Sequence, residues 1–236
     1  PRQVNLIKTG DKAMSYQHQF IDNSPCNLPP GKVVCVGLNY AAHVAEMNSQ
    51  NIGEPLLFIK PATALTPIEE AIRIPEGRGA CHFESEMALL IGQPLKSCKE
   101  EDVIQAIAGV GIALDLTLRD LQKQLKTAGQ PWEKAKGWDG ACPLSPFVKT
   151  QAVADLQDVD IKLWQNGELK QDGNTGQMLT PVVPLICHIT EFFSLQPGDV
   201  VLTGTPEGVG PLQKGDALKL QLGGLLEINA GIVEAW

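Results

Sequence analysis

Two glutamates stand two positions apart in the otherwise largely apolar segment CHFESEMALLIG, residues 81–92. Successive side chains of a strand point to opposite faces, so a strand here places Glu84 and Glu86 on the same face. Two carboxylates held this close repel each other, which raises the cost of ionising either one. A bound divalent cation would remove that cost. The alternative is an exposed strand edge at which water solvates both acids.

A third carboxylate, Asp115, interrupts the apolar run VGIALDLTL at residues 110–118. An isolated carboxylate buried in such a run is costly unless it is paired or bound to a metal. Its alternative is a paired structural acid or a strand-end cap. Three carboxylates without cysteine favour Mg²⁺ or Mn²⁺ over Zn²⁺, with Ca²⁺ as a further alternative. His82 shares the predicted face of Glu84 and is a candidate fourth ligand, although a histidine beside the site or in the core is the simpler interpretation.

A histidine and a glutamate in NYAAHVAEM, residues 39–47, form a candidate catalytic pair. His43 and Glu46 are three positions apart, which places them on one face of a helix and within reach of each other. A carboxylate beside an imidazole fixes its tautomer and raises its basicity, as a general base acting on water requires. The alternative is an ordinary surface pair.

Lys136 lies in a Pro- and Gly-rich segment, with Trp132 and Trp138 nearby. A lysine there could neutralise a substrate carboxylate or a developing enolate, and the alternative is an exposed loop lysine. Further along, GTPEGVG at residues 204–210 lacks the spacing of both the Walker loop and the Rossmann fingerprint. We interpret it as a tight turn after a strand, able to present backbone amides to an anion.

The elements that must position these residues are mostly strands, with a few short helices between them. The Asn166-Gly167 pair predicts a hairpin turn. Strands and helices alternate too irregularly for a doubly wound sheet, so we expect a β-rich α+β domain. Strands are expected at residues 32–37, 56–61, 81–92, 110–118 and 199–204, with two or three closing strands and glycine turns over 216–236. Helices are expected at 39–47, 97–109 (Ser97 as N-cap), 119–129 and 181–193, and a loop at 130–146.

The composition narrows the class of protein. The 236 residues are 43% hydrophobic and 19% charged, which excludes a disordered chain, and the net charge of −8 without a basic run argues against nucleic-acid binding. No apolar run approaches the roughly 18 residues that cross a membrane, and no secretory signal is visible. The six cysteines form no C-x-x-C pair, so we expect a reduced, cytoplasmic protein without structural zinc or a disulfide framework.

Taken together, these segments resemble the fumarylacetoacetate hydrolase family. The resemblance is closest to its short single-domain branch of acylpyruvate hydrolases and oxaloacetate decarboxylases. It implies a mixed β-sandwich roll with short inserted helices, a homodimer and a Mg²⁺ or Mn²⁺ site. Residues 1–30 match nothing in it and are expected to form an N-terminal arm or small subdomain, with the catalytic domain at 31–236. The matching blocks, in order, are KVVCVGLNYAAHVAEM, PLLFIKPATAL, HFESEMALLIG, GIALDLTLRDLQ, GQPWEKAKGWDGACPLSP and VVLTGTPEGVGPLQKGD.

The resemblance also implies roles for individual residues. The family's E-x-E and later Asp match Glu84, Glu86 and Asp115 as metal ligands. Its His/Glu dyad matches His43 and Glu46, and its loop lysine matches Lys136. Positions that contact the oxo-acid end of the substrate match Arg119 and Gln122, and a threonine beside the substrate carboxylate matches Thr205.

The function that the resemblance implies is metal-dependent cleavage of a carbon–carbon bond in a small 2-oxo or β-diketo acid through a pyruvate enolate. Acylpyruvate hydrolysis and oxaloacetate decarboxylation share that enolate, so the sequence does not separate them. One alternative is an isomerase or decarboxylase of ring-cleavage products, of the 2-hydroxyhepta-2,4-diene-1,7-dioate isomerase type. Another is a catalytically silent, metal-stabilised binding protein.

Overall fold

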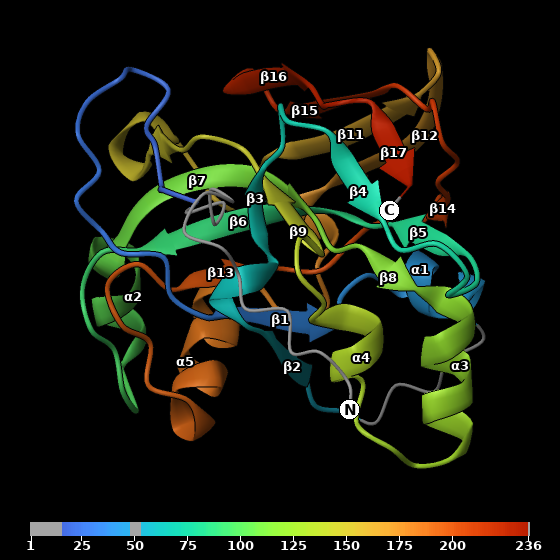
Figure 1. Ribbon diagram of the computed structural model, residues 1–236. Coiled ribbons are helices and arrows are strands. Elements are labelled where there is room, and N and C mark those ends of the chain that lie inside the picture. Colours follow the sequence, from blue (N-terminus) through green and yellow to red (C-terminus); the bar gives the residue numbers. More distant parts are fainter. Residues whose placement is uncertain (1–15, 48–52, 236) are drawn as a thin grey trace, which may run out of the picture.

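The computed structural model describes residues 16–47 and 53–235, and its largest element is a curled sheet of eight strands (Figure 1). The strand order is β2-β1-β13-β6-β7-β9-β3, with β10 paired to β7. The β1–β13 and β3–β9 pairs are parallel and the others antiparallel, so the sheet is mixed as expected. Its strands are β1 (Val33–Gly37), β2 (Leu56–Lys60), β3 (Leu65–Pro67), β6 (Ser85–Ile91), β7 (Ile107–Leu114), β9 (Cys142–Leu144), β10 (Val148–Lys149) and β13 (Val200–Leu202).

Strand β6 shows why this sheet lies in the interior. Alternate side chains, Met87 and Leu89 on one face and Ala88 and Leu90 on the other, belong to two different core clusters, and all are fully buried. Because β6 is apolar on both faces, its side chains pack into the cores on both sides of the sheet. The sheet therefore separates two hydrophobic cores.

The pairing of β6 with β7 brings distant acids together. Ser85 lies opposite Leu114 in this antiparallel pair, and one step further the Asp115 amide donates to the Glu84 carbonyl at 2.8 Å. Residues directly opposite each other have neighbouring side chains. The register thus places Asp115 beside Glu84 although 31 positions separate them in the sequence.

A second sheet has the order β12-β11-β15-β16 and lies at the top of Figure 1. Asn166 and Gly167, which join β11 to β12, have φ angles of 53° and 85°, the backbone of a type I′ turn, so the predicted hairpin is confirmed. Two small sheets, β14-β5-β8 and β17-β4, complete the strands. These strands are β4 (Ile72–Ile74), β5 (Cys81–Phe83), β8 (Thr117–Leu118), β11 (Asp160–Gln165), β12 (Glu168–Asn174), β14 (Gly210–Pro211), β15 (Leu218–Leu222), β16 (Leu226–Asn229) and β17 (Val233–Ala235).

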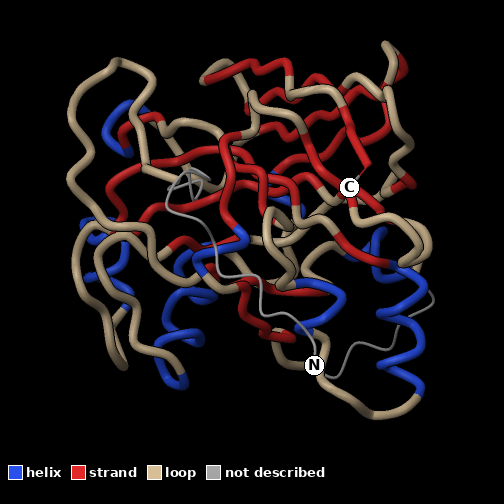
Figure 2. The backbone as a smooth tube through the Cα atoms, in the orientation of Figure 1, coloured by secondary structure: helices blue, strands red, loops and turns tan. Residues whose placement is uncertain are grey.

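The helices are few and short, and most lie on the side of the large sheet away from β16 (Figures 1 and 2). Helices α3 and α4 lie together at one end of this side, and α2 and α5 pack at the other. The helices are α1 (Ala41–Glu46), α2 (Glu100–Ala106), α3 (Arg119–Thr127), α4 (Glu133–Lys136) and α5 (Val182–Phe192), with 3-10 turns at Ala62–Ala64, Thr150–Ala152 and Thr175–Gln177.

Four of the predicted elements need correction. The strand expected over 81–92 is two strands, because the chain leaves the ladder at Glu84. The strand expected over 110–118 begins at Ile107 and breaks at Asp115, and the loop expected over 130–146 contains α4 and β9.

The helix expected over 97–109 is also shorter than predicted, and Ser97 does not cap it. The Ser97 amide donates to the Thr190 carbonyl on α5, which holds Ser97 outside the helix. The N-cap residue of this helix is instead Lys99, whose amide donates to the Asp102 carboxylate at 3.2 Å.

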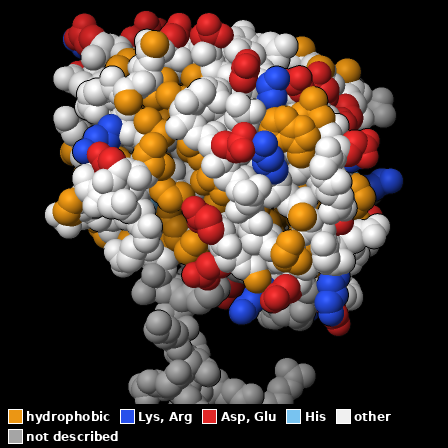
Figure 3. Space-filling view, turned by 90° about the horizontal axis from the view of Figure 1, so that it is seen from above, with side chains coloured by type: hydrophobic (Ala, Val, Ile, Leu, Met, Phe, Trp, Pro, Cys, Tyr) orange, Lys and Arg blue, Asp and Glu red, His pale blue; other side chains and the backbone are white. Residues whose placement is uncertain are grey.

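Three further observations concern the surface charges, the residues before β1 and the length of the helices. On the face shown in Figure 3, acidic and basic side chains are interspersed rather than gathered into one basic patch. In the described residues before β1, Tyr16 is buried in the second core cluster and Phe20 pairs with Phe147. None of the helices within residues 16–47 and 53–235 has the length and apolar character needed to cross a membrane.

Candidate functional site

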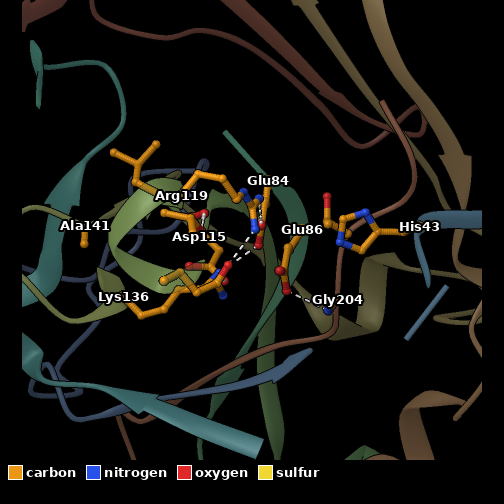
Figure 4. A network of polar contacts seen from close by, with 12 residues as sticks. His43, Glu84, Glu86, Asp115, Arg119, Lys136, Ala141 and Gly204 are labelled. Atoms are coloured by element: carbon orange, nitrogen blue, oxygen red, sulfur yellow. Dashed lines mark hydrogen bonds and ion pairs between the residues drawn. The ribbon is translucent and has the colours of Figure 1, made fainter. Parts of the chain in front are cut away.

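Three buried carboxylates form the centre of the site (Figure 4). Glu84, Glu86 and Asp115 are each at most 5% exposed, and one oxygen of each lies within 4.8 Å of an oxygen of the others. The β6–β7 register described above brings them together. The alternative of solvated acids on an exposed strand edge is therefore wrong.

Three cations neutralise two of these carboxylates. Lys136 Nζ donates to Glu84 Oε2 at 2.8 Å and to Asp115 Oδ2 at 2.5 Å. Arg119 pairs with the other Glu84 oxygen, and Lys60 Nζ lies 2.8 Å from Asp115 Oδ1. Lys136 is 3% exposed, so the alternative of an exposed loop lysine is wrong.

The surroundings move the pKa values of these groups in opposite directions. Burial alone would raise the pKa of Glu84, but the charges of Lys136 and Arg119 outweigh burial and hold this pKa well below its ordinary range. Within the described residues no cation pairs directly with Glu86, and burial together with the charges of Asp115 and Glu84 outweighs the more distant charge of Lys136 and raises the pKa of Glu86 well above its ordinary value. Burial would lower the pKa of Lys136, yet the two carboxylates raise it, so this ammonium stays charged.

A backbone amide rather than a side chain supports Glu86. The Gly204 amide donates to Glu86 Oε2 at 2.6 Å. Gly204 has a φ of +97°, and a Cβ there would lie 2.7 Å from the Asn39 Cβ, so the position requires glycine. Asn39 holds this loop by donating to the Thr203 carbonyl at 2.8 Å.

The predicted dyad forms on helix α1. His43 Nδ1 lies 2.9 Å from Glu46 Oε2, and because a carboxylate only accepts, Nδ1 must carry the proton. In the neutral imidazole, that tautomer leaves a lone pair on Nε2. Glu46 is itself fixed, since its other oxygen accepts from the Gly208 amide at 3.1 Å. The GTPEGVG loop therefore presents amides to anions as predicted, and the anions are the protein's own carboxylates.

One cavity joins the dyad to the carboxylates. His43, Glu84, Glu86 and Lys136 all line it, and Figure 4 shows the two glutamates between His43 on one side and Asp115 and Lys136 on the other. The remaining wall comes from apolar, aromatic and polar side chains: Val36, Leu38, Leu56, Phe58, Arg119, Gln122, Lys126, Trp132 and Thr205, among others.

The predicted substrate contacts Arg119, Gln122 and Thr205 all lie on this wall. Arg119 donates to Gln122 Oε1 at 2.8 Å, while its Nε is buried without a hydrogen-bond partner among the described residues. The Thr205 hydroxyl donates to the Ser85 carbonyl at 2.9 Å and accepts from Gln171 at 2.8 Å. With its proton used, this hydroxyl can accept from a ligand but not donate to a carboxylate. The roles in substrate binding stay predictions.

The carboxylate cluster fits a hard divalent cation. Three anionic oxygen donors with no cysteine or histidine among them suit Mg²⁺ or Mn²⁺. The Lys136 ammonium already takes a cation's place between Glu84 and Asp115, whereas the partner of Glu86 among the described residues is a backbone amide. His82 is not part of the cluster.

Three supporting residues were missed by the sequence analysis. Lys60 is fully buried and donates to the Leu116 and Ala141 carbonyls in addition to contacting Asp115. Gln171 uses its amide to hold both Ser85 and Thr205, and Asn39 anchors the loop of Gly204. A lysine ending the apolar run LLFIK was the one available signal, since a charge there must be paired.

Comparison with known proteins bears directly on this site. Residues 32–233 match the family model described as "Fumarylacetoacetate (FAA) hydrolase C-terminal". Oxaloacetate tautomerase YcgM of Escherichia coli (strain K12) is 51% identical over 210 residues, covering 89% of this chain and 96% of that protein.

Two solved structures share the fold, and the proteins are named for different enzymatic activities. Fumarylpyruvate hydrolase from Pseudomonas aeruginosa, in complex with Mn²⁺ and pyruvate, is 33% identical with a TM-score of 0.87, covering 92% of this chain and 95% of that one. A 2-hydroxyhepta-2,4-diene-1,7-dioate isomerase from Mycobacterium marinum is 35% identical with a TM-score of 0.77, covering 88% and 76%. These matches confirm the mixed β-rich fold expected from the sequence.

Proposed function

The chain belongs to the fumarylacetoacetate hydrolase family, and from that premise we propose that it is a divalent-metal-dependent enzyme of oxaloacetate keto–enol tautomerisation. The observation that carries the proposal is one cavity lined by a histidine with a free Nε2 lone pair and by two of three clustered, buried carboxylates. The 51% sequence identity to an oxaloacetate tautomerase, over 96% of that protein, supports this choice of reaction.

The carboxylates and their cations would bind and orient the 2-oxo acid end of the substrate. Glu84, Glu86 and Asp115 would hold the metal, whose chemistry when bound is to act as a Lewis acid toward the 2-oxo group. Lys136 stays charged and stands beside these ligands, so it can stabilise negative charge that develops on the substrate. Arg119 and Gln122 line the same wall and would fix the orientation of the acid.

His43 would move the proton. In the keto form, Nε2 accepts a proton from C3, and the electron pair of that C–H bond forms the C2–C3 double bond as charge moves to the 2-oxo oxygen. Protonation of that oxygen gives the enol, and the reverse order returns a proton to C3. Glu46 stabilises the imidazolium that forms in between, because its carboxylate accepts from Nδ1.

Carbon–carbon bond cleavage is the second candidate, favoured by the same dyad. A base with a free Nε2 can also take a proton from a water that attacks the acyl carbonyl of an acylpyruvate, giving pyruvate and a carboxylic acid. The resemblance to a fumarylpyruvate hydrolase supports this reaction. Decarboxylation of oxaloacetate, a further cleavage reaction, needs no activated water. Double-bond isomerisation of a ring-cleavage product, the activity named for a similar structure, would again require His43 to move a proton.

The proposal is tested with metal-stripped protein supplied with Mg²⁺, Mn²⁺ or neither. Loss of oxaloacetate enol, followed by its ultraviolet absorbance, measures tautomerisation, while pyruvate formation from oxaloacetate or acetylpyruvate measures cleavage. Metal-dependent loss of the enol faster than pyruvate forms is the expected result. Pyruvate formation at the same rate as enol loss would replace tautomerisation by cleavage as the main reaction.

We expect His43→Ala to reduce tautomerisation and acylpyruvate hydrolysis about 10²- to 10⁴-fold, the usual contribution of a general base. Decarboxylation of oxaloacetate should be spared, because it requires no proton acceptor at the start. Parallel assays of the three reactions check this, with His188→Ala on α5 as the matched control away from the cavity. Equal loss of all three activities would contradict the assignment of His43 as the base.

We also propose that the enzyme is a cytoplasmic homodimer. All six cysteines are free, which suits a reducing compartment. Among the described strands, β2 lies at one of the two edges of the large sheet, and its apolar residues Leu56 to Ile59 are half-buried, so a second copy could cover it. Light scattering of the purified chain tests the dimer, and a monomer mass would refute it.

A further inference from the structure

Helix α3 presents three polar side chains to the cavity in one row. Arg119, Gln122 and Lys126 are spaced three and four residues apart, which puts them on one face of the helix, and all three line the cavity. Arg119 and Gln122 are hydrogen-bonded to each other and Arg119 is also paired with Glu84. Lys126, one to two turns further on, is exposed.

Of the described lysine and arginine residues on this wall, Lys126 is the one for which the described residues supply no carboxylate partner. Arg119 and Lys136 are both committed to Glu84, whereas within the described part of the chain Lys126 makes no ion pair. An ammonium at the edge of a cavity, paired with no acid of the protein, is available to an anionic group of a ligand.

Two aromatic rings link Lys126 to the buried end of the site. Lys126 Nζ lies 5.6 Å from the centre of the Trp132 ring, and Trp132 lies 6.1 Å from Phe58, centre to centre. Phe58 in turn lies 4.9 Å from Lys136 Nζ. Both rings line the cavity, which therefore has an apolar wall with Lys136 at its inner end and Lys126 at its outer end.

From this arrangement we infer that Lys126 binds the distal carboxylate of a dicarboxylic 2-oxo acid and thereby selects dicarboxylic over monocarboxylic substrates. The inference rests on the proposed function, which puts the 2-oxo acid end at the buried carboxylates. A molecule anchored there and extended along Phe58 and Trp132 carries its second charge toward Lys126. The stacking on Trp132 holds the ammonium in place, so less of its motion is lost on binding.

The test compares Lys126→Met with the wild type on fumarylpyruvate, a dicarboxylic 2-oxo acid long enough to extend from the buried carboxylates along Phe58 and Trp132. Methionine keeps an unbranched apolar side chain on Trp132 and removes only the charge. We expect KM to rise about fivefold with kcat unchanged, as the loss of one exposed ion pair predicts. Lys126→Arg should restore KM, and added salt should weaken binding to the wild type more than to Lys126→Met. Lys123→Met, an exposed lysine of the same helix that does not line the cavity, is the matched control.

A binding measurement separates this inference from the proposed function. Calorimetry of the Mg²⁺-loaded protein with 2-oxopimelate and with 2-oxoheptanoate, two acids of equal chain length that differ in the distal carboxylate, requires no turnover. The preference for the dicarboxylic acid should fall about fivefold in Lys126→Met, whether or not the wild type acts on oxaloacetate. An unchanged preference, or an equal loss of affinity for both acids, overturns the role of Lys126. Absence of oxaloacetate turnover in the wild type refutes the proposed function alone.

Discussion

Replacing Glu86 with glutamine is expected to abolish metal-dependent turnover while making the metal-free protein more stable at neutral pH. Glutamine keeps the shape of the side chain and can still accept from the Gly204 amide. It removes one of three anionic donors, so activity should fall about a thousandfold, in line with the several kcal/mol that a Lewis acid supplies. Turnover and calorimetric Mg²⁺ binding measure these losses.

The stability change has a defined dependence on pH. Burial and the neighbouring carboxylates raise the pKa of Glu86 in the folded protein above its ordinary value of 4.5. An acid with a raised folded-state pKa binds more protons folded than unfolded, so its contribution to stability is lost as pH rises from the unfolded-state pKa through the folded-state pKa. The variant lacks this loss, and its advantage over the metal-free wild type should grow with pH.

Urea unfolding at a series of pH values, with metal removed, checks this expectation. Glu76→Gln, which changes an exposed loop carboxylate, is the matched control and should unfold like the wild type at every pH. A constant difference between Glu86→Gln and wild type would refute the raised pKa. Retained Mg²⁺ affinity would refute the metal site.

Lys136→Met is expected to separate metal binding from catalysis. Lys136 joins Glu84 to Asp115, and its removal leaves two buried carboxylates with one cation each. Breaking such buried pairs costs about 3–5 kcal/mol, so the metal-free variant should be clearly less stable than the wild type. A divalent cation can take over the lost charge, so Mg²⁺ should stabilise the variant more than it stabilises the wild type.

Catalysis should nevertheless be lost in this variant. Without the ammonium, none of the described residues supplies a positive charge that bridges Glu84 and Asp115 and can stabilise developing negative charge, so turnover should drop about 10²- to 10³-fold even at saturating Mg²⁺. Thermal unfolding with and without Mg²⁺ and turnover at saturating metal measure both effects. Lys134→Met on the same short helix, whose side chain is exposed, provides the control. Full activity in Lys136→Met would remove Lys136 from the mechanism.

The sequence was informative where local patterns decide the structure. The two-residue spacing of Glu84 and Glu86 predicted that they lie together, and the three-residue spacing of His43 and Glu46 predicted their contact on α1. The type I′ hairpin followed from Asn166-Gly167 in the same way. Each of these features depends on neighbours a few residues apart.

The sequence grouped Asp115 with Glu84 and Glu86 as metal ligands, but it did not show the long-range pairing that brings them together. Asp115 joins Glu84 only through the register of β6 and β7, which no local pattern specifies. Lys60 meets Asp115 because the β2 end and the segment after β7 converge. Ser97 looked like an N-cap, but a hydrogen bond to Thr190 on a distant helix uses its amide instead.

The loop of Gly204 and Gly208 has a consequence for how this scaffold can diversify. Its two amides, four residues apart, bind Glu86 of the carboxylate cluster and Glu46 of the dyad. An insertion or deletion between them would alter the separation of the reacting groups, so the length of this loop should be constrained in any active descendant. Helix α3 and strand β2 contribute the cavity wall without setting that separation. New substrates should therefore arise by substitutions on α3 and β2, while the chemistry at the buried end is inherited unchanged.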